Sequence, residues 1–176
     1  MAVRTILPFG EAVLRKKCKP VTEVNGRILS LLDDLKETLY AEEGRAGLAA
    51  PQIGILRRAV VMDCGDGYRE FMNPELLHAE GEQDGMEACL SFPGYYGRVK
   101  RYDYIRVRSL DRSGEIVTLE AEGYLARCIQ HEMDHLDGVL FVDRVVDDFI
   151  IHEATHQRVS LLDVLRVTNR NVQPTQ

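Results

Sequence analysis

The chain lacks several features that would assign it to a special class of protein. Its 176 residues contain no apolar run near the roughly 20 residues that a membrane-spanning helix needs, so we expect no membrane partner. Residues 1–9 carry one arginine and no apolar core, and we expect no secretion signal there. An excess of positive charge is also absent, because 22 lysines and arginines stand against 28 aspartates and glutamates. The net charge of -6 argues against an electrostatic or sequence-specific nucleic-acid binder.

Cysteine is sparse as well. The four cysteines, Cys18, Cys64, Cys89 and Cys128, show no close pairing pattern. Without a secretion signal, such thiols are expected to be reduced or to bind a metal rather than to form disulfides, and the cytoplasm is the expected location. The apolar content of 45% and the charged content of 28% are typical of a globular protein. The length predicts a single domain over residues 1–176.

The spacing of apolar residues predicts an α+β fold. A central helix should pack against small, mostly antiparallel sheets, with further helices near the N and C termini. The predicted helices run from the cap Asn25 to about Gly44 and over residues 123–136 and 147–166. The predicted strands span 59–62, 70–72, 104–110, 115–120 and 139–142, with a hairpin turn at 111–114. Residues after about 168 are polar and are expected to fray.

Residues 131–135 read HEMDH, which is an H-E-x-x-H pattern on the predicted central helix. Two histidines four positions apart lie on one face of a helix, one turn above the other. His131 and His135 could therefore bind one divalent metal ion, with Glu132 beside it as a proton carrier. This arrangement activates water for attack on a carbonyl. The same five residues also fit an ordinary solvated helix face, so a third ligand matters to the interpretation.

The third ligand has several candidates, because a catalytic site of the zinc type usually has three protein ligands and one open position. One known motif continues to a third histidine, but Phe141 stands at that position. Glu153 is a candidate on the predicted C-terminal helix. Cys128 is seven residues from His135, about 10.5 Å along a helix, which is too far for its thiol to share a metal ion with both histidines. We expect Cys128 to pack in the core. Cys89, within EACLS at 87–91, is a further candidate.

Three segments together resemble the peptide deformylase family: GLAAPQ at 47–52, EACLS at 87–91 and QHEMDHL at 130–136. They stand in the family's order and at about its spacing, and the resemblance covers most of the chain. It implies a metal-dependent hydrolase that removes the formyl group from the N-terminal formylmethionine of new polypeptides and releases formate. The implied ligands are Cys89, His131 and His135. Fe(II) is the expected metal, and this donor set also suits Zn(II), Ni(II) or Co(II).

The resemblance also implies roles for residues around the metal. Glu132 is the general base, while the side-chain amide of Gln52 and the backbone N–H of Leu90 donate to the oxyanion. Gln130 is expected to brace the loop of Cys89. The implied partner is a formylated nascent polypeptide, near the ribosome surface in the bacterial cytoplasm.

The peptide is expected to lie extended beside residues 46–48 and to bind through main-chain hydrogen bonds. Gly47 would let the two backbones approach closely. By the same resemblance, Arg127 and Cys128 are expected to line the pocket for the methionine side chain. The residues expected to contact the substrate are Ala46, Gly47, Leu48, Arg127 and Cys128.

Two positions depart from the family's motifs. Arg45 stands where the first glycine of G-x-G-L-A-A-x-Q is expected, unless that glycine is displaced to Gly44. Ala88 replaces the glycine of E-G-C-L-S, and it would be strained by about 1–2 kcal/mol if that position needs a positive φ. Two other interpretations stay open. One is a small metallopeptidase with Glu153 as its third ligand, and the other is a non-catalytic peptide-binding module.

Overall fold

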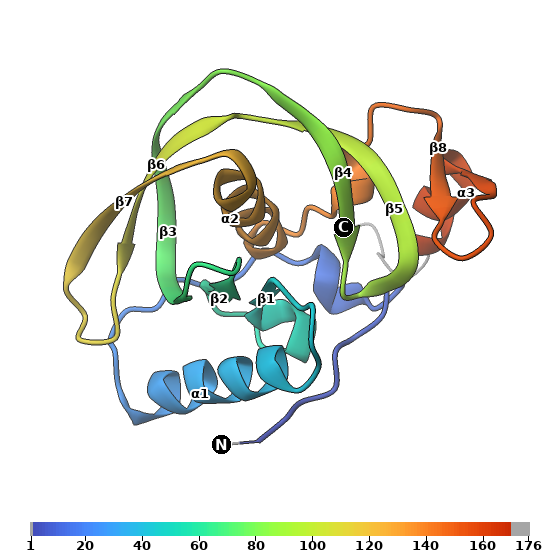
Figure 1. Ribbon diagram of the computed structural model, residues 1–176. Helices are drawn as coiled ribbons and strands as arrows, with labels where there is room; N and C mark the ends of the chain where they lie inside the picture. Colours follow the sequence, from blue (N-terminus) through green and yellow to red (C-terminus); the bar gives the residue numbers. More distant parts are fainter. Residues whose placement is uncertain (1, 170–176) are drawn as a thin grey trace, which may run out of the picture.

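The computed structural model describes residues 2–169 and has the mixed α and β architecture that the sequence predicts. Its strands form two antiparallel sheets, in the orders β1-β2-β3-β6-β7 and β4-β5-β8-β9. The strands are β1 (Gly47–Ala49), β2 (Ala59–Asp63), β3 (Tyr68–Glu80), β4 (Gln83–Cys89), β5 (Phe92–Arg101), β6 (Tyr104–Leu110), β7 (Ile116–Glu122), β8 (Phe149–His152) and β9 (Arg158–Ser160). The helices are α1 (Gly26–Tyr40), α2 (Gly123–Leu136) and α3 (Leu161–Thr168). Helix α2 lies at the centre, and the long strands arch around it (Figure 1).

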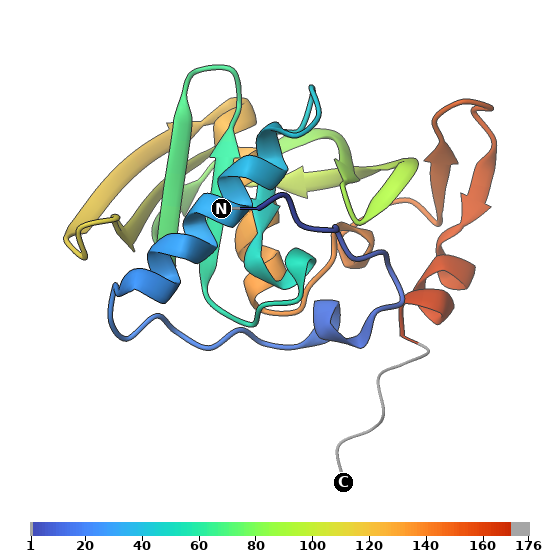
Figure 2. The same ribbon diagram turned by 90° about the horizontal axis from the view of Figure 1, so that it is seen from below.

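The five-stranded sheet is covered by a helix on each face, and β2 shows why. Successive side chains of a strand point to opposite faces. Val60 and Met62 pack in the cluster that includes residues of α2, whereas Val61 packs in the cluster that includes α1. Figure 2 shows α1 crossing the sheet, with α2 on its far side. Because both faces of β2 are buried, residues 59–62 are apolar throughout rather than alternating.

Helix α1 begins where the sequence predicts and ends earlier. The side chain of Asn25 accepts hydrogen bonds from the backbone N–H groups of Arg27 and Ile28, at 3.1 and 3.3 Å, which confirms the predicted cap. The helix ends at Tyr40 rather than near Gly44. The segment that follows the helix leads into β1, and its residues 42–46 line the site described below.

The predicted helix over residues 147–166 is wrong. This segment forms the hairpin of β8 and β9 and then the short helix α3. His156 in the connecting turn has φ 55°, which interrupts any continuous helix. Strand β8 also pairs with β5, through Tyr96 and Ile151. The helical spacing of apolar residues could not reveal this partner, because β5 is distant in the sequence.

Two further differences concern short segments. Residues 139–142 are not a strand. A 3-10 turn covers Phe141–Asp143, and the Asp143 carboxylate accepts a hydrogen bond from the backbone N–H of Leu140 at 2.8 Å. Strands β4 and β5 were not predicted. The expected fraying concerns residues 170–176, which lie outside the described part.

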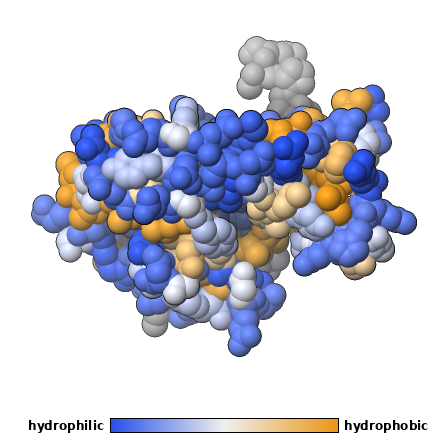
Figure 3. Space-filling view, turned by 45° about the horizontal axis from the view of Figure 1, so that its top comes forward, coloured by the Kyte–Doolittle hydropathy of each residue, from blue (hydrophilic) through white to orange (hydrophobic). Residues whose placement is uncertain are grey.

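The surface and the helices give two further facts. Figure 3 shows a mostly hydrophilic face that is interrupted by hydrophobic patches. Within residues 2–169, no helix has both the length and the apolar character required to cross a membrane.

Candidate metal centre and catalytic site

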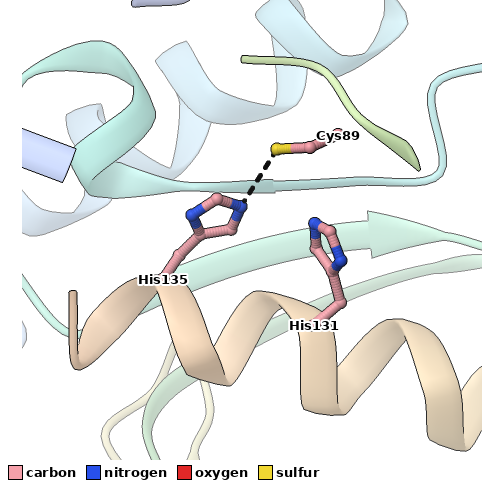
Figure 4. Close-up of side chains that lie close together, drawn as sticks. All are labelled: Cys89, His131 and His135. Atoms are coloured by element: carbon pink, nitrogen blue, oxygen red, sulfur yellow. Dashed lines mark hydrogen bonds between the residues drawn. The ribbon is translucent and has the colours of Figure 1, made fainter. Parts of the chain in front are cut away.

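Helix α2 carries both histidines of the H-E-x-x-H pattern to the centre of the fold. Cys89 lies at the end of β4 in the four-stranded sheet. A register shift in the pairing of β4 with β5 falls between Ala88 and Cys89. The Cys89 Sγ and His135 Nε2 atoms lie 3.4 Å apart, and the potential ligand atoms of Cys89, His131 and His135 all lie within 4.8 Å of one another. Figure 4 shows the sulfur facing the two imidazole rings. All three side chains are buried.

The spacing of these atoms suits a tetrahedral metal ion. Metal–sulfur and metal–nitrogen bonds of about 2.3 and 2.1 Å place neighbouring ligand atoms about 3.4–3.6 Å apart. The upper value applies to a sulfur and a nitrogen, and the 3.4 Å between Cys89 Sγ and His135 Nε2 is close to it. Burial lowers the pKa of His135 well below its ordinary value, so this imidazole is held in the neutral form that binds metals. The donor set therefore fits a divalent transition metal.

A buried carboxylate fixes the orientation of His131. The Nδ1 atom of His131 lies 2.9 Å from Glu87 Oε2, which leaves Nε2 to face the site. Burial alone would lower the pKa of His131, but its hydrogen bonds with Cys89 and Glu87 outweigh it and raise the pKa well above the ordinary value. A metal ion would bind the side chains of Cys89 and His131 in their deprotonated forms.

Glu87 is held by two buried arginines. Arg101 donates to both of its carboxylate oxygens at 2.7 and 2.9 Å, and Arg127 Nη1 donates to Oε1 at 2.9 Å. Burial by itself would raise the pKa of Glu87, but the hydrogen bonds from Arg101 and His131 hold it well below its ordinary range. Glu87 therefore stays ionised and can accept the proton of the His131 ring. The sequence interpretation assigned Glu87 no role, although it lies in the EACLS segment.

Asp134, one helical turn after His131, extends this ionic network along α2. Its carboxylate accepts hydrogen bonds from Arg101 at 2.6 Å and from Arg144 at 2.5 and 2.7 Å. Gln130, in contrast, does not brace the Cys89 loop. Its amide bonds to the backbone of Tyr102, as donor and as acceptor, and to the carbonyl of Ala126. Gln130 fixes the turn between β5 and β6 instead.

Glu132 lies beside the ligand cluster in a buried position, and Gly47 makes room for it. Burial raises the pKa of Glu132 to about 7. Its Oε2 atom is buried and has no hydrogen-bond partner among the described residues. A Cβ atom on Gly47 would lie 2.5 Å from Glu132 Oε1. The small size of Gly47 thus admits the Glu132 carboxyl group, a reason that the sequence interpretation did not consider.

Gln52 directs its amide nitrogen toward the same cluster. Its Oε1 accepts a hydrogen bond from the backbone N–H of Ala49 at 2.9 Å, which fixes the orientation of the amide. Nε2 then lies 3.2 Å from Ser91 Oγ and 3.7 Å from Cys89 Sγ. Leu90 stands between Cys89 and Ser91 in the chain and lines the cavity described next. The structure brings both expected oxyanion donors to the cluster, and their role remains a prediction.

A cavity of about 750 Å³ opens onto this cluster. Most of the residues expected to contact the substrate line it: Ala46, Gly47, Arg127 and Cys128. Leu48 is an exception, because its side chain is fully buried in the cluster that includes α1. It can offer only its backbone. Arg127 lies on the cavity wall, but its guanidinium group is engaged with Glu87 and the carbonyl of Val99.

The two departures from the family's motifs have simple structural settings. Ala88 does not belong to the residues with positive φ among those described, so the expected strain is not present. Its methyl group lies exposed on the cavity wall. Arg45 donates to the carbonyl of Thr38 near the end of α1 and to the Glu42 carboxylate, at 2.5 and 2.6 Å. Gly44 adopts φ 83°, a conformation that favours glycine.

Comparisons with known proteins agree on one family. A family model described as polypeptide deformylase matches residues 3–148. A peptide deformylase of Caldanaerobacter subterraneus subsp. tengcongensis is 54% identical over 146 residues, which cover 83% of this chain and 91% of that protein. The solved peptide deformylase of Thermotoga maritima is 42% identical, with a TM-score of 0.81 over 84% of this chain and 100% of that one. The solved peptide deformylase of Legionella pneumophila is 35% identical, with a TM-score of 0.81, and the match covers 96% of this chain and 95% of that one.

Proposed function

The chain belongs to the peptide deformylase family, and on this premise we propose that Cys89, His131 and His135 hold its metal ion. Enzymes of this family remove the formyl group from the N terminus of new polypeptides by metal-dependent hydrolysis. The observation that carries the assignment is the buried convergence of one thiol and two imidazoles beside an unpartnered carboxylate oxygen. Neutral imidazoles and a thiolate are the forms in which these side chains bind metals.

Glu132 is the proposed proton carrier. A bound divalent metal supplies a water whose pKa lies near neutrality. The carboxylate of Glu132 would accept a proton from the attacking water and would return it to the departing amine nitrogen. Its Oε2 atom is the free acceptor in this scheme. The positive charge of the metal would also favour the ionised carboxylate, against the effect of burial.

Gln52 and Leu90 are the proposed donors to the oxyanion. The bond from Ala49 holds the Gln52 amide with its N–H groups toward Cys89 and Ser91, before any substrate arrives. Donors that are fixed in this way need no reorganisation when negative charge develops on the formyl oxygen. The backbone N–H of Leu90, next to the ligand Cys89, completes the proposed pair.

The substrate peptide is proposed to extend β1. This strand is at the edge of its sheet, and β2 is its only neighbour in the strand order. An edge strand has unused backbone groups that can pair with an extended chain. Ala46 and Gly47 line the cavity at this edge, next to Glu132. The formyl carbon carries only hydrogen besides its amide, so a narrow site can exclude acetyl and larger acyl groups by size.

Fe(II) is the proposed working metal, as the resemblance implies, although the donor set also accepts Zn(II), Ni(II) or Co(II). The proposed partner is a formylated nascent polypeptide near the ribosome surface in the cytoplasm, without a membrane or a specific nucleic acid. The metallopeptidase interpretation is less well supported. Glu153 lies in the turn after β8, exposed on the cavity wall, and is not in the ligand cluster.

Formate release tests this proposal. Fe(II)-loaded protein, kept without oxygen, is expected to release formate from a formyl-Met tripeptide and no acetate from the acetyl-Met tripeptide. The difference follows from the size of the acyl group, because one added methyl group must fit against the proposed oxyanion donors. Cleavage of the internal peptide bonds without formate release would favour the metallopeptidase interpretation. Binding of the formyl peptide without any product would favour the non-catalytic module.

A further inference from the structure

Two cysteines outside the metal cluster, Cys64 and Cys128, are in contact with each other, and Cys128 also lines the cavity. Cys64 directly follows β2, and Cys128 lies on α2, one turn before His131. Their thiols hydrogen-bond to one another, and the Tyr124 hydroxyl group also hydrogen-bonds to Cys128. Both cysteines are partly exposed, whereas Cys18 is buried. A small solute can therefore reach the pair.

A bond between these sulfurs would join the two walls of the site. Cys128, Tyr124 and Glu132 line the cavity on the side of α2. Cys64 follows the strand that holds β1 in place, because Met62 pairs with Gly47 and the backbone N–H of Asp63 donates to Ala46 at 2.9 Å. The proposed peptide-binding edge and the helix of the metal ligands thus meet at this pair.

We propose that Cys64 and Cys128 are a redox modification site, at which a peroxide forms a reversible disulfide that reduces substrate access to the cavity. The effect on turnover rests on the proposed function. The formation of the disulfide does not, because it requires only the two thiols and the oxidant.

The chemistry balances with hydrogen peroxide as the oxidant. The Cys64 thiolate attacks one peroxide oxygen and the O–O bond breaks. Hydroxide leaves, and Cys64 becomes a sulfenic acid. The Cys128 sulfur then attacks Cys64 Sγ. The S–S bond forms, the S–O bond breaks, and the departing hydroxide takes the Cys128 proton as water. Two thiols are oxidised and one peroxide is reduced to two waters. A dithiol reverses the reaction by exchange.

The environment selects Cys64 as the first sulfur to react. The hydrogen bond from Cys128 lowers the pKa of Cys64 below its ordinary value, and the thiolate is the reactive form. The same contact, together with burial, raises the pKa of Cys128. Burial raises the pKa of Cys18 to about 11, so Cys18 should react slowly and is a suitable control.

The disulfide is expected to act on substrate binding. An S–S bond of about 2.05 Å draws the two sulfurs inward from hydrogen-bond contact, and the attached strand end and helix turn must follow. Small displacements of positioning groups have large kinetic effects. We expect kcat/KM to fall by about tenfold, mainly through a higher KM, because the change is at the wall rather than at the reacting atoms.

The test uses the Zn(II)-loaded enzyme, because Zn(II) has no redox chemistry of its own. After exposure to hydrogen peroxide, free thiols are alkylated, disulfide-linked peptides are identified by mass spectrometry, and formate release is measured before and after addition of dithiothreitol. The parent should show a linked peptide with Cys64 and Cys128 and a loss of activity that dithiothreitol reverses. Cys64→Ser should keep its full activity under the same exposure, and Cys18→Ala should behave as the parent does.

Three results would overturn the proposal. These are the absence of the linked peptide, a linked peptide with unchanged kcat/KM, and an equal loss of activity in Cys64→Ser. An equal loss of activity in Cys64→Ser would indicate oxidation of Cys89, and the mass of the peptide that contains Cys89 would reveal it. Failure of the proposed function gives a different pattern, in which the untreated enzyme releases no formate and the linked peptide still forms.

Discussion

Glu132→Gln is expected to lower kcat by a factor of about 10²–10⁴ while the metal stays bound. Glutamine has nearly the same shape, so it fits the space beside Gly47, but it cannot take a proton from water. Because Glu132 is not in the ligand cluster, the metal content should equal that of the parent. The measurements are steady-state formate release and metal analysis of the purified variant.

Glu153→Gln is the matched control, since Glu153 lines the same cavity and receives no role in the proposed reaction. Its kcat and metal content should equal those of the parent. The assignment of the base is wrong if Glu132→Gln retains the parent's kcat. A loss of metal in Glu153→Gln would instead revive the interpretation in which Glu153 is the third ligand.

Glu87→Gln is expected to destabilise the fold by about 3 kcal/mol and to weaken metal binding by about 10–100-fold. The substitution leaves Arg101 and Arg127 buried without the carboxylate that both contact. It also removes the charged acceptor for His131. Urea unfolding of the metal-free protein measures the first effect, and competition with a chelator measures the second.

The pH dependence of this effect has a definite sign. The pKa of Glu87 in the fold lies below its ordinary value of 4.5, so the folded state favours the ionised carboxylate. Its contribution to the free energy of unfolding is present above that ordinary value and is lost as the pH falls toward the folded pKa. The difference in stability between the parent and Glu87→Gln should therefore shrink below about pH 4.5.

Glu75→Gln provides the comparison for Glu87. Glu75 pairs with Arg108 on the surface, where its side chain is 58% exposed. Exposed pairs contribute about 0–1 kcal/mol, so this variant should unfold almost as the parent does. Equal costs for Glu87→Gln and Glu75→Gln would show that the buried network does not stabilise the fold as proposed.

The parts of the site that the sequence reveals are those set by local geometry. The spacing of His131 and His135 determines that both face one side of α2, whatever surrounds the helix. The cap at Asn25 and the hairpin at 111–114 are local in the same sense, and the structure confirms both. The position of Cys89 depends instead on the end of β4 and on the packing of two sheets. The residues alone left Cys89 as one of several candidates, and the resemblance to a family selected it.

The parts that the sequence does not reveal depend on distant partners. Residues 147–166 have helical spacing, but β5 offers an edge that makes Phe149–His152 a strand. Glu87 and Arg101 become important only because the hairpin of β4 and β5 brings them together behind His131. Gly47 shows the same limit. Its role is to leave room for the Glu132 side chain. No pattern in the sequence around Gly47 indicates that the two residues lie side by side.

The central claim is that one thiolate and two imidazoles hold the metal ion, and X-ray absorption spectroscopy of the Zn(II)-loaded protein tests it most directly. The account predicts one sulfur at about 2.3 Å and two imidazole nitrogens at about 2.0–2.1 Å, with one oxygen donor. These would be Cys89, His131 and His135. A coordination shell of nitrogen and oxygen without sulfur would contradict the account, because it would remove Cys89 from the metal.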